Sequence, residues 1–464
     1  MKGSISPFLT IAEAGRLIAA KRLSPVELAK ELLARIETTD SRLNAFLLVT
    51  ERQAMAAARA AERAVMTGRR GPLLGIPVAY KDIYETAGVR TTAHSRILAD
   101  NVPKEDAETV RRLGAEGAVM LGKLATHEFA IGGPAFDLPW PPAHNPWDLR
   151  RFTGGSSSGS GAAVAAGLVL GALGSDTGGS IRQPAAFCGI AGIKPTPGLV
   201  SRRGVIPLAP SLDTAGPMAW TAQDCAILLD ALAGHDPLDP ASVAGPKISY
   251  AGAIGAPLRG LRVGLLRRFY EHDVPASPEM LQMLNRAVAT LKGLGCRVED
   301  AALPAVQEYN AVGRVIISSE AYALHEATLK NRLSDYSRVF RVRVLAGALV
   351  RAADYIAAQR RRSDLIVTTA KVFEKFDVLI SAPTAGAAPM LNEQRPDDGF
   401  SRPLLTTVAN VAAIPSMVVC GGFTAAGLPL GLEIMGPAWS DAMVLRVGHQ
   451  FEQAAGTRDR RPAL

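Results

Sequence analysis

Residues 153–194 constrain the fold of this chain more than any other stretch. They contain a Gly/Ser run (154–161), an apolar segment rich in Ala and Gly (162–173) and a second small-residue loop (174–180). Glycine allows backbone conformations that are closed to other residues and lets neighbouring groups approach closely. Flexible linkers do not carry an apolar segment between two serine loops. We therefore expect the segment to be a buried helix whose two flanking loops bring serines and backbone N–H groups into one pocket.

The composition is that of a globular protein. Of the 464 residues, 48% are hydrophobic and 20% are charged, which is enough to bury a sizeable core. The net charge of +8 is spread along the chain, and no basic run is interleaved with aromatic residues, so we expect no nucleic-acid partner. The apolar segment is shorter than the roughly 20 residues of a membrane-spanning helix, and no signal peptide is apparent. These features predict a protein that does not bind a membrane.

The cysteine and histidine patterns indicate neither disulfides nor a metal site. The four cysteines lie far apart and form no CxxC pair, which is typical of a reducing, cytoplasmic compartment. His127-Glu128 begins like a zinc-binding HExxH motif, but Ile131 stands at the position of the second histidine. We therefore expect no metal and no cofactor. The cysteines are Cys188, Cys225, Cys296 and Cys420.

Strands and helices alternate along the chain. This alternation favours an α/β fold with a large, mainly parallel or mixed sheet, and residues 305–375 are expected to be mostly helical. Short apolar runs predict strands at 76–80, 118–121, 261–266, 297–299, 377–381, 416–420 and 430–435, the last two as a neighbouring pair. Helices are expected near 10–16, 24–36, 53–66, 107–114, 221–233, 278–293 and 442–456.

Three serine-based arrangements can be tested against the loops. The stretch 155–159 matches the GxSxG nucleophile elbow with Ser157 at its centre, but a poor strand precedes it and the later histidines lie in no recognisable context. A Ser-x-x-Lys arrangement fails, because no serine stands three residues before Lys81, Lys123 or Lys194. The third arrangement pairs Lys81 with serines of both loops. Lys81 directly follows an apolar strand, which is unusual because lysine is seldom fully buried unless it is paired.

The third arrangement closely resembles the amidase signature family of serine amidohydrolases. Lys81 lies in GIPVAYKD, Ser156 in GGSSSGSG and Ser180 in GSDTGGSIRQP, with spacings of 75 and 24 residues that agree with the family. The signature block covers about 74–217, and a weaker resemblance reaches the C-terminus, so that residues 1–464 are expected to form a single amidase domain. The resemblance implies a mixed, mostly parallel twisted sheet covered by helices on both faces. It also implies that the helical segment lies on the substrate side.

The same resemblance implies a Ser–cisSer–Lys triad. Ser180 would be the nucleophile, Ser156 with its cis peptide bond would shuttle protons, and Lys81 would be the base. Burial lowers the pKa of a lysine from its usual value near 10.4, so a neutral Lys81 could take a proton from Ser156, which takes one from Ser180. The developing oxyanion would be held by the backbone N–H groups of Thr177, Gly178, Gly179 and Ser180.

Other residues are expected to support the site or to line it. Asp176 and Arg182 bracket the second loop and should hold it by pairing, and Ser157 should form hydrogen bonds within the first loop. The aromatic and small residues after His127 should form a pocket for a neutral, apolar or aromatic group. This expected pocket consists of Phe129, Ile131, Gly132, Phe136 and Trp140.

The substrate is less constrained than the chemistry. The signature block also resembles one component of glutamyl-tRNA amidotransferase, its A subunit, which releases ammonia from glutamine and works with partner subunits. Residues 402–410 lack the acid that holds the substrate's amino group in that component, and residues 131–140 resemble stand-alone bacterial amidases. We therefore expect a free-standing amidase for small apolar or aryl amides, compatible with a homodimer, and keep the glutamine-hydrolysing component as the alternative. A non-enzymatic binding scaffold is disfavoured, since all three triad residues are present.

Overall fold

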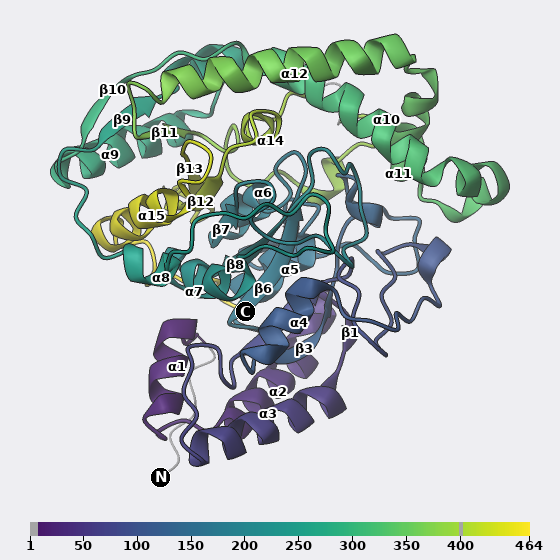
Figure 1. The fold of residues 1–464 in the computed structure, drawn as a ribbon, viewed down its shortest axis with the longest axis vertical. Coiled ribbons are helices and arrows are strands. Elements are labelled where there is room, and N and C mark those ends of the chain that lie inside the picture. The colour runs from purple at the N-terminus through teal and green to yellow at the C-terminus, as the bar shows by residue number, and fades with distance from the viewer. Residues whose placement is uncertain (1–7, 399–401) are drawn as a thin grey trace.

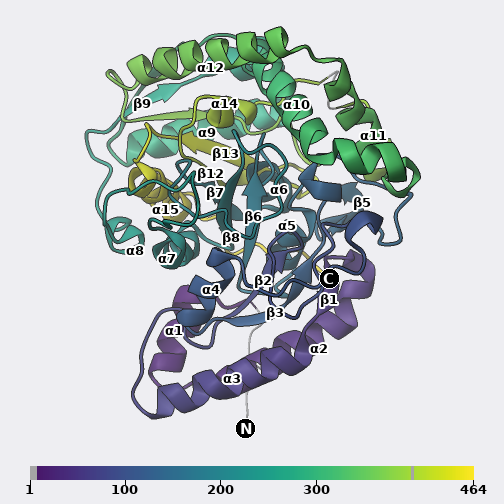
Figure 2. The same ribbon diagram turned by 45° about the vertical axis from the view of Figure 1, so that its right-hand side comes forward.

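The structure is a computed structural model that describes residues 8–398 and 402–464. An 11-stranded sheet runs through the molecule in the order β1-β3-β2-β6-β8-β7-β12-β13-β11-β9-β10. The N-terminal helices α2 and α3 lie at one end of the molecule and α10, α11 and α12 at the opposite end (Figures 1 and 2). Strands from both halves of the chain thus alternate with helices around one sheet, as an α/β fold requires.

The N-terminal part forms one edge of the sheet and the helices beside it. Helix α2 starts as expected, since the Ser24 hydroxyl accepts hydrogen bonds from the backbone N–H groups of Val26 and Glu27, and Pro25 occupies the first turn. The elements are α1 (Ile11–Ala19), α2 (Pro25–Leu43), β1 (Phe46–Val49), α3 (Glu51–Met66), β2 (Pro77–Lys81), η1 (Arg96–Leu98), α4 (Glu108–Ala115), β3 (Val119–Leu124) and η2 (Glu128–Ala130).

The central part differs from the sequence-based expectation. The apolar segment expected as one helix divides into a short helix, α5 (Ser158–Ala165), and a strand, β6 (Gly171–Asp176). Gly167 adopts a left-handed conformation between them (φ 66°), and β6 then pairs with β2 and β8. The prediction of a single helix was therefore wrong. The other central elements are β4 (His144–Asn145), β5 (Asp148–Phe152), α6 (Arg182–Cys188), β7 (Ala191–Lys194), β8 (Thr214–Ala219) and α7 (Ala222–Leu232).

The C-terminal part completes the sheet and adds long helices. As expected, residues 305–375 are mostly helical and β12 pairs with β13 as a neighbouring antiparallel strand. The elements are α8 (Tyr250–Ala253), β9 (Arg262–Leu265), η3 (Phe269–Asp273), α9 (Pro278–Gly293), β10 (Arg297–Asp300), α10 (Val306–Arg332), η4 (Leu333–Asp335), α11 (Arg338–Val344), η5 (Leu345–Leu349), α12 (Ala352–Val372), β11 (Val378–Ser381), η6 (Leu391–Glu393), α14 (Thr407–Val411), β12 (Ser416–Phe423), β13 (Pro429–Met435) and α15 (Asp441–Ala455).

The sheet is mixed, but it is not mostly parallel. Four of its ten strand pairings are parallel and six are antiparallel. Parallel neighbours need a crossover, usually a helix. Between β7 and β8 the chain runs through residues 195–213 without a helix, and β12 and β13 are joined by the short loop 424–428. Direct connections of this kind produce the antiparallel centre, which strand periodicity alone does not reveal.

Helices cover both faces of the sheet, as expected. Successive side chains of a strand point to opposite faces. On β12, Met417 and Val419 face Gly448 of α15, while Val418 lies on the side of Ala186 in α6, as the space around Gly431 shows. Within the described residues no helix is long and apolar enough to cross a membrane.

Candidate active site

The second small-residue loop is built around a buried ion pair. It connects the end of β6 to the start of α6, and both its flanking charges, Asp176 and Arg182, have fully buried side chains that meet at 2.8 Å. Asp176 Oδ1 also accepts a hydrogen bond from Gly179 N at 2.8 Å, and Oδ2 accepts one from Ile181 N at 3.1 Å. Burial raises the pKa of Asp176, but Arg182 outweighs this effect and lowers it to about 2. The expected pairing is therefore present and shapes the loop.

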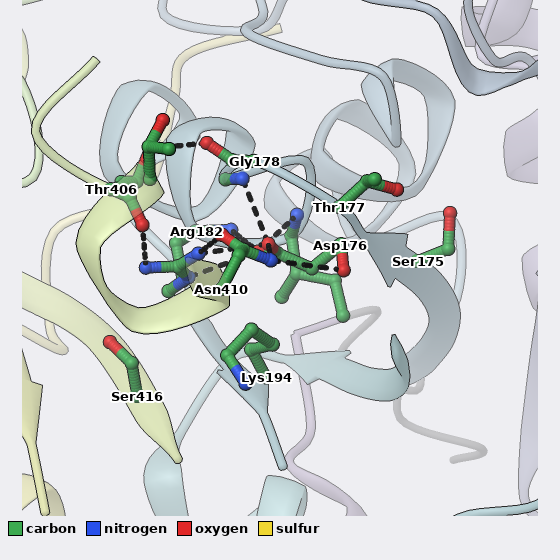
Figure 3. Close-up of polar contacts among 12 residues, drawn as sticks. Ser175, Asp176, Thr177, Gly178, Arg182, Lys194, Thr406, Asn410 and Ser416 are labelled. Atoms are coloured by element: carbon green, nitrogen blue, oxygen red, sulfur yellow. Dashed lines mark hydrogen bonds and ion pairs between the residues drawn. The ribbon is translucent and has the colours of Figure 1, made fainter. Parts of the chain in front are cut away.

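Arg182 also fastens this loop to the C-terminal part of the chain. Its guanidinium donates to Thr406 O, Glu433 Oε1 and Asn410 Oδ1, each at 2.6 Å. The Thr406 hydroxyl in turn donates to Gly178 O at 2.8 Å. Figure 3 shows the segment that carries Thr406 and Asn410 lying against the loop, with Arg182 between them. The loop is thus clamped from the side by residues that no local pattern predicts.

Lys81 ends strand β2 and is completely buried. Its Nζ lies 2.7 Å from Ser156 Oγ and 2.8 Å from Ser175 Oγ. Burial lowers the pKa of Lys81 to about 7, although the charges of Asp213 and Asp176 act in the opposite direction. A substantial fraction of this lysine is therefore neutral at pH 7 and able to accept a proton. Ser175 was not among the expected site residues.

The first loop places Ser156 beside the second loop. The Gly155–Ser156 peptide bond is cis. Ser157 N donates to Ser180 O at 3.1 Å, and the Ser157 hydroxyl bonds both the carbonyl oxygen and the N–H of Ser175 at 3.2 Å. These contacts agree with the loop-supporting role expected of Ser157. The two serine loops are therefore joined directly through backbone groups.

His127 packs beneath the first loop. Its backbone N–H donates to Ser156 O at 3.1 Å, its Nδ1 accepts from Gly133 N at 2.7 Å, and its ring stacks on Phe152. A Cβ atom at Gly155 would lie 1.9 Å from the His127 ring. Within residues 8–398 and 402–464, no three His, Cys, Asp or Glu side chains gather as metal ligands would.

Of the four expected oxyanion donors, one already has an acceptor. The N–H of Gly179 is bonded to Asp176 Oδ1, so an oxyanion would have to share it. Thr177 is held by its side chain, whose hydroxyl donates to Asp213 Oδ1 at 2.5 Å. Thr177, Gly178, Gly179 and Ser180 all line one cavity of about 450 Å³.

Only part of the expected substrate pocket lines this cavity. Ile131 and Gly132 do so. Phe129 is instead buried among the rings of His325, Tyr336 and Phe340. Phe136 is 60% exposed, and Trp140 lies against His94. Neither is part of the cavity wall.

A half-buried arginine forms another part of the cavity wall. Arg343 of α11 donates from Nε to Pro396 O at 2.9 Å, and among the described residues no carboxylate lies within 4.0 Å of its guanidinium. Its Nη1 and Nη2 lie beside Gly132 and Gly133, where an added Cβ would come within 3.1 and 3.2 Å of them. Burial lowers the pKa of Arg343 to about 10, so it stays cationic. The sequence offered no signal for it, because other arginines surround it.

Comparisons with known proteins agree with this geometry. Residues 27–445 match the family model described as Amidase. The chain is 38% identical to the A subunit of glutamyl-tRNA(Gln) amidotransferase from Azotobacter vinelandii (strain DJ / ATCC BAA-1303), over 98% of this chain and 99% of the relative. It is 39% identical to the corresponding protein of Moorella thermoacetica (strain ATCC 39073 / JCM 9320), again over 98% and 99%.

Three solved structures are similar over nearly the whole chain. One belongs to a vestigial complex that reveals the evolutionary origins of an s-triazine catabolic enzyme, with a TM-score of 0.91, 33% identity, and coverage of 98% of this chain and 100% of that one. Native peptide amidase from Stenotrophomonas maltophilia has a TM-score of 0.85 and 31% identity, with coverage of 98% of each chain. A bacterial aryl acylamidase has a TM-score of 0.87 and 27% identity, with coverage of 97% of this chain and 98% of that one. The chain therefore belongs to the amidase signature family of amide-hydrolysing enzymes.

Proposed function

We propose that this protein cleaves a carboxylic amide through an acyl-enzyme on Ser180. The observation that carries the proposal is the buried contact of 2.7 Å between Lys81 Nζ and Ser156 Oγ, in a loop bonded directly to Ser180. A lysine whose pKa is about 7 lies close to the optimum for a general base at neutral pH. Lys81 accepts a proton from Ser156 as Ser156 accepts one from Ser180.

The reaction then follows from the positions of the two serines. Ser180 Oγ attacks the amide carbon, and the backbone N–H groups of residues 177–180 hold the oxyanion that forms. Ser156 returns its proton to the amide nitrogen, the C–N bond breaks, and ammonia or an amine leaves. Water cleaves the remaining ester to give the carboxylate and restore Ser180.

Arg343 indicates the class of amide. Arg343 is half-buried and lines the cavity; the charges of Asp398 and Asp397 act on it, but no carboxylate of the described residues pairs with it within 4.0 Å. Such a cation favours a substrate that brings its own anion, because charges removed from water are normally paired. We therefore propose a small amide whose acyl part bears a carboxylate, with the amide carbon at Ser180 and the carboxylate at Arg343. The expectation of an apolar or aryl amide stays a prediction that the same experiment tests.

A second candidate is glutamine hydrolysis in a complex with partner subunits. The relatives named as A subunits of glutamyl-tRNA(Gln) amidotransferase, at 37–39% identity, favour it. Glutamine also carries an ammonium group, yet residues 402–410 contain no carboxylate. In the part of the cavity wall that the structure describes, the acid is Asp398, which lies 3.4 Å from Arg402 Nε. We therefore place glutamine second.

Matched substrates separate these candidates. Glutaramate and pentanamide share a five-carbon chain and differ by the carboxylate, L-glutamine adds an amino group, and 4-nitroacetanilide represents aryl amides. We expect kcat/KM for glutaramate to exceed that for pentanamide by about 10- to 150-fold, the value of a hydrogen bond to a charged group. Arg343→Gln should abolish this difference, whereas Arg341→Gln, on the same helix but outside the cavity wall, should keep it.

Each other outcome has a definite meaning. Faster turnover of glutamine than of glutaramate supports the second candidate. Equal or faster turnover of pentanamide or 4-nitroacetanilide contradicts a carboxylate site and supports the apolar or aryl expectation. A fluorophosphonate probe tests the nucleophile independently of the substrate, and labelling that persists in Ser180→Ala would refute the acyl-enzyme.

A further inference from the structure

A second cavity approaches Lys81 from another side. It measures about 250 Å³ and is lined by Ser175, whose hydroxyl contacts Lys81 Nζ, together with Asp213 and Thr214. Most of the remaining wall is apolar and includes Ile83, Val205, Ile206, Leu208 and Leu238. Arg202, Arg203 and Asp239 also line it, and Arg202 donates from Nη1 to the backbone oxygen of Asp213 at 3.2 Å. Asp213 thus shares a cavity with the residue that holds the lysine, and the apolar parts of the wall make charges interact more strongly than in water.

The register of two strands explains why Asp213 is at this point. Strands β6 and β8 are antiparallel, with Ser175 opposite Ala215 and Asp176 opposite Thr214. Asp213 comes just before β8, and its carboxylate accepts a hydrogen bond from the hydroxyl of Thr177, just after β6, at 2.5 Å. Because side chains alternate along a strand, Ser175 and Asp176 point to opposite faces of β6, Ser175 toward Lys81 and Asp176 toward Arg182. Asp213 lines the same cavity as Ser175.

The hydrogen bonds of Asp213 are those of a carboxylate. Oδ1 accepts from Thr177 Oγ1, Oδ2 accepts from Leu208 N at 2.8 Å and Ala209 N at 3.0 Å, and neither oxygen donates. Burial raises the pKa of Asp213 above its usual value, and these bonds and the charge of Arg202 offset that rise only in part. No basic side chain of the described residues lies within 4.0 Å of this carboxylate, whereas Asp176 is paired with Arg182.

The groups around Lys81 are few. Two hydroxyls, those of Ser156 and Ser175, contact its Nζ, and Asp213 and Asp176 supply the negative charges that act on it. His127, on the side of the first loop, has its pKa lowered well below its usual value by burial and by the charge of Lys81, and is therefore neutral. Asp213 is the acid in this set whose charge is not cancelled by an ion pair.

We propose that Asp213 is a positioning residue of the amidase site: it fixes Thr177 of the oxyanion loop by hydrogen bonding, and its charge sets the lowest pH at which Lys81 works as a base. The inference rests on the proposed role of Lys81 and assigns a second acid to the site besides the Asp176–Arg182 pair. The expected pH effect has an unusual direction, because removing this acid should let the enzyme work at lower pH.

The pH dependence of Ser180 labelling by a fluorophosphonate tests the charge directly and needs no natural substrate. In the wild-type protein, labelling should rise with pH as Lys81 loses its proton. Asp213→Asn keeps the shape and can still accept from Leu208 N while donating to the Thr177 hydroxyl. We call the rise of the labelling rate with pH its acidic limb. In this variant we expect the acidic limb to move down by roughly 1 pH unit, the size of a nearby-charge effect.

Two control variants separate charge from structure. Asp239→Asn removes another carboxylate that lines the second cavity and should leave the limb in place. Thr177→Val removes the hydrogen bond but keeps the Asp213 carboxyl, so the plateau rate should fall by about 3- to 10-fold, while any downward shift of the limb should be clearly smaller than in Asp213→Asn, since the lost bond raises the pKa of Asp213 without removing its charge. Circular dichroism and thermal unfolding confirm that each variant is folded. If Asp213→Asn does not fold, Asp213→Ser carries the same expectation.

The outcomes distinguish this inference from the proposed function. Wild-type protein that is not labelled at Ser180 would refute the proposed function itself. If Ser180 is labelled with an acidic limb, but the limb of the Asp213 variants stays or moves up, the role of Asp213 is refuted. An equal downward shift in Asp239→Asn, or a shift of that size in Thr177→Val, would refute it as well.

Discussion

Replacing Arg182 with methionine tests how much the clamp between the second small-residue loop and the C-terminal part of the chain stabilises the protein. Methionine keeps the length and the apolar stem of the side chain, but it removes the guanidinium. Two carboxylates, Asp176 and Glu433, then remain fully buried without their counter-charge, and Thr406 O and Asn410 Oδ1 lose a donor.

The magnitude follows from this arrangement. Breaking a buried ion pair by removing one partner costs about 3–5 kcal/mol. The unfolding entropy is roughly 2.1 cal/mol/K per residue near 60 °C, which gives about 1 kcal/mol/K for 464 residues. We therefore expect Tm to fall by about 3–5 °C in Arg182→Met. Arg111→Met is a matched control, because Arg111 pairs with Glu108 at 2.6 Å but its side chain is 60% exposed, and surface pairs contribute little.

The fall in Tm of Arg182→Met should depend on pH in a defined direction. In the wild-type protein the folded-state pKa of Asp176, about 2, lies below its unfolded value near 3.9. Its contribution is therefore complete above the unfolded pKa and is lost as pH falls through about 2. Without Arg182, the largest effect that opposes burial is gone, and only weaker ones such as the Asn410 bond and the charge of Lys194 remain. We therefore expect the pKa of Asp176 to rise, so that the folded variant takes up a proton as pH falls. The Tm difference should be greatest near pH 7–8 and shrink toward pH 5.

Thermal unfolding followed by circular dichroism, at several pH values, measures these quantities. A Tm for Arg182→Met within 1 °C of the wild-type value at pH 7.5 would refute the reasoning. A Tm difference that grows as pH falls would refute it too, because protonation of the two carboxylates relieves the penalty that the argument assigns to them.

Three further predictions concern the site itself. Labelling by a fluorophosphonate should rise with pH and reach half its plateau near pH 7, because neutral Lys81 is required, and Lys81→Met should abolish this labelling; equal labelling at pH 5 and pH 8 would contradict it. Ser175→Ala removes one of the two hydroxyls on Lys81, and the labelling rate should fall by about 3- to 10-fold; an unchanged rate would show that Ser175 does not help to position the lysine. Gly155→Ala forces a methyl group into the ring of His127 and should lower the free energy of unfolding by about 1–3 kcal/mol, measured by urea denaturation. Gly114→Ala, whose Cβ meets open space, is the control and should not be destabilised.

The proposed catalytic residues could be named from the sequence because they lie in long, specific stretches. The apolar run before Lys81 predicted a strand, and β2 indeed ends at that residue, which is completely buried. The flanking charges of the second loop, Asp176 and Arg182, pair as expected. Each of these features depends on residues close together in the chain, which is where sequence patterns are informative.

The remaining site residues depend on tertiary contacts. Arg182 bonds Thr406, Asn410 and Glu433 across 224, 228 and 251 residues of sequence, and no local pattern links such distant positions. Arg343 lies in an arginine-rich helical segment, and only its packing against Gly132 and Gly133 distinguishes it from a surface arginine.

The error over residues 161–174 has a different cause. Short apolar runs that are buried on all sides give no period by which a helix can be told from a strand. The left-handed turn at Gly167 and the pairing of Gly171 with Val78 decide the outcome, and the second of these depends on a strand far away in the sequence. The antiparallel centre of the sheet was missed for the same reason.

The clamp around Arg182 also joins parts of the chain that are synthesised far apart in time. The second small-residue loop is translated early, but its last anchor, Glu433, emerges 251 residues after Arg182. At the usual 5–20 residues per second, the loop waits roughly 10–50 s for that anchor. During this interval the chain already carries its lysine and both serines but lacks the support that orders them. We therefore expect an unfinished or prematurely terminated chain not to hydrolyse amides.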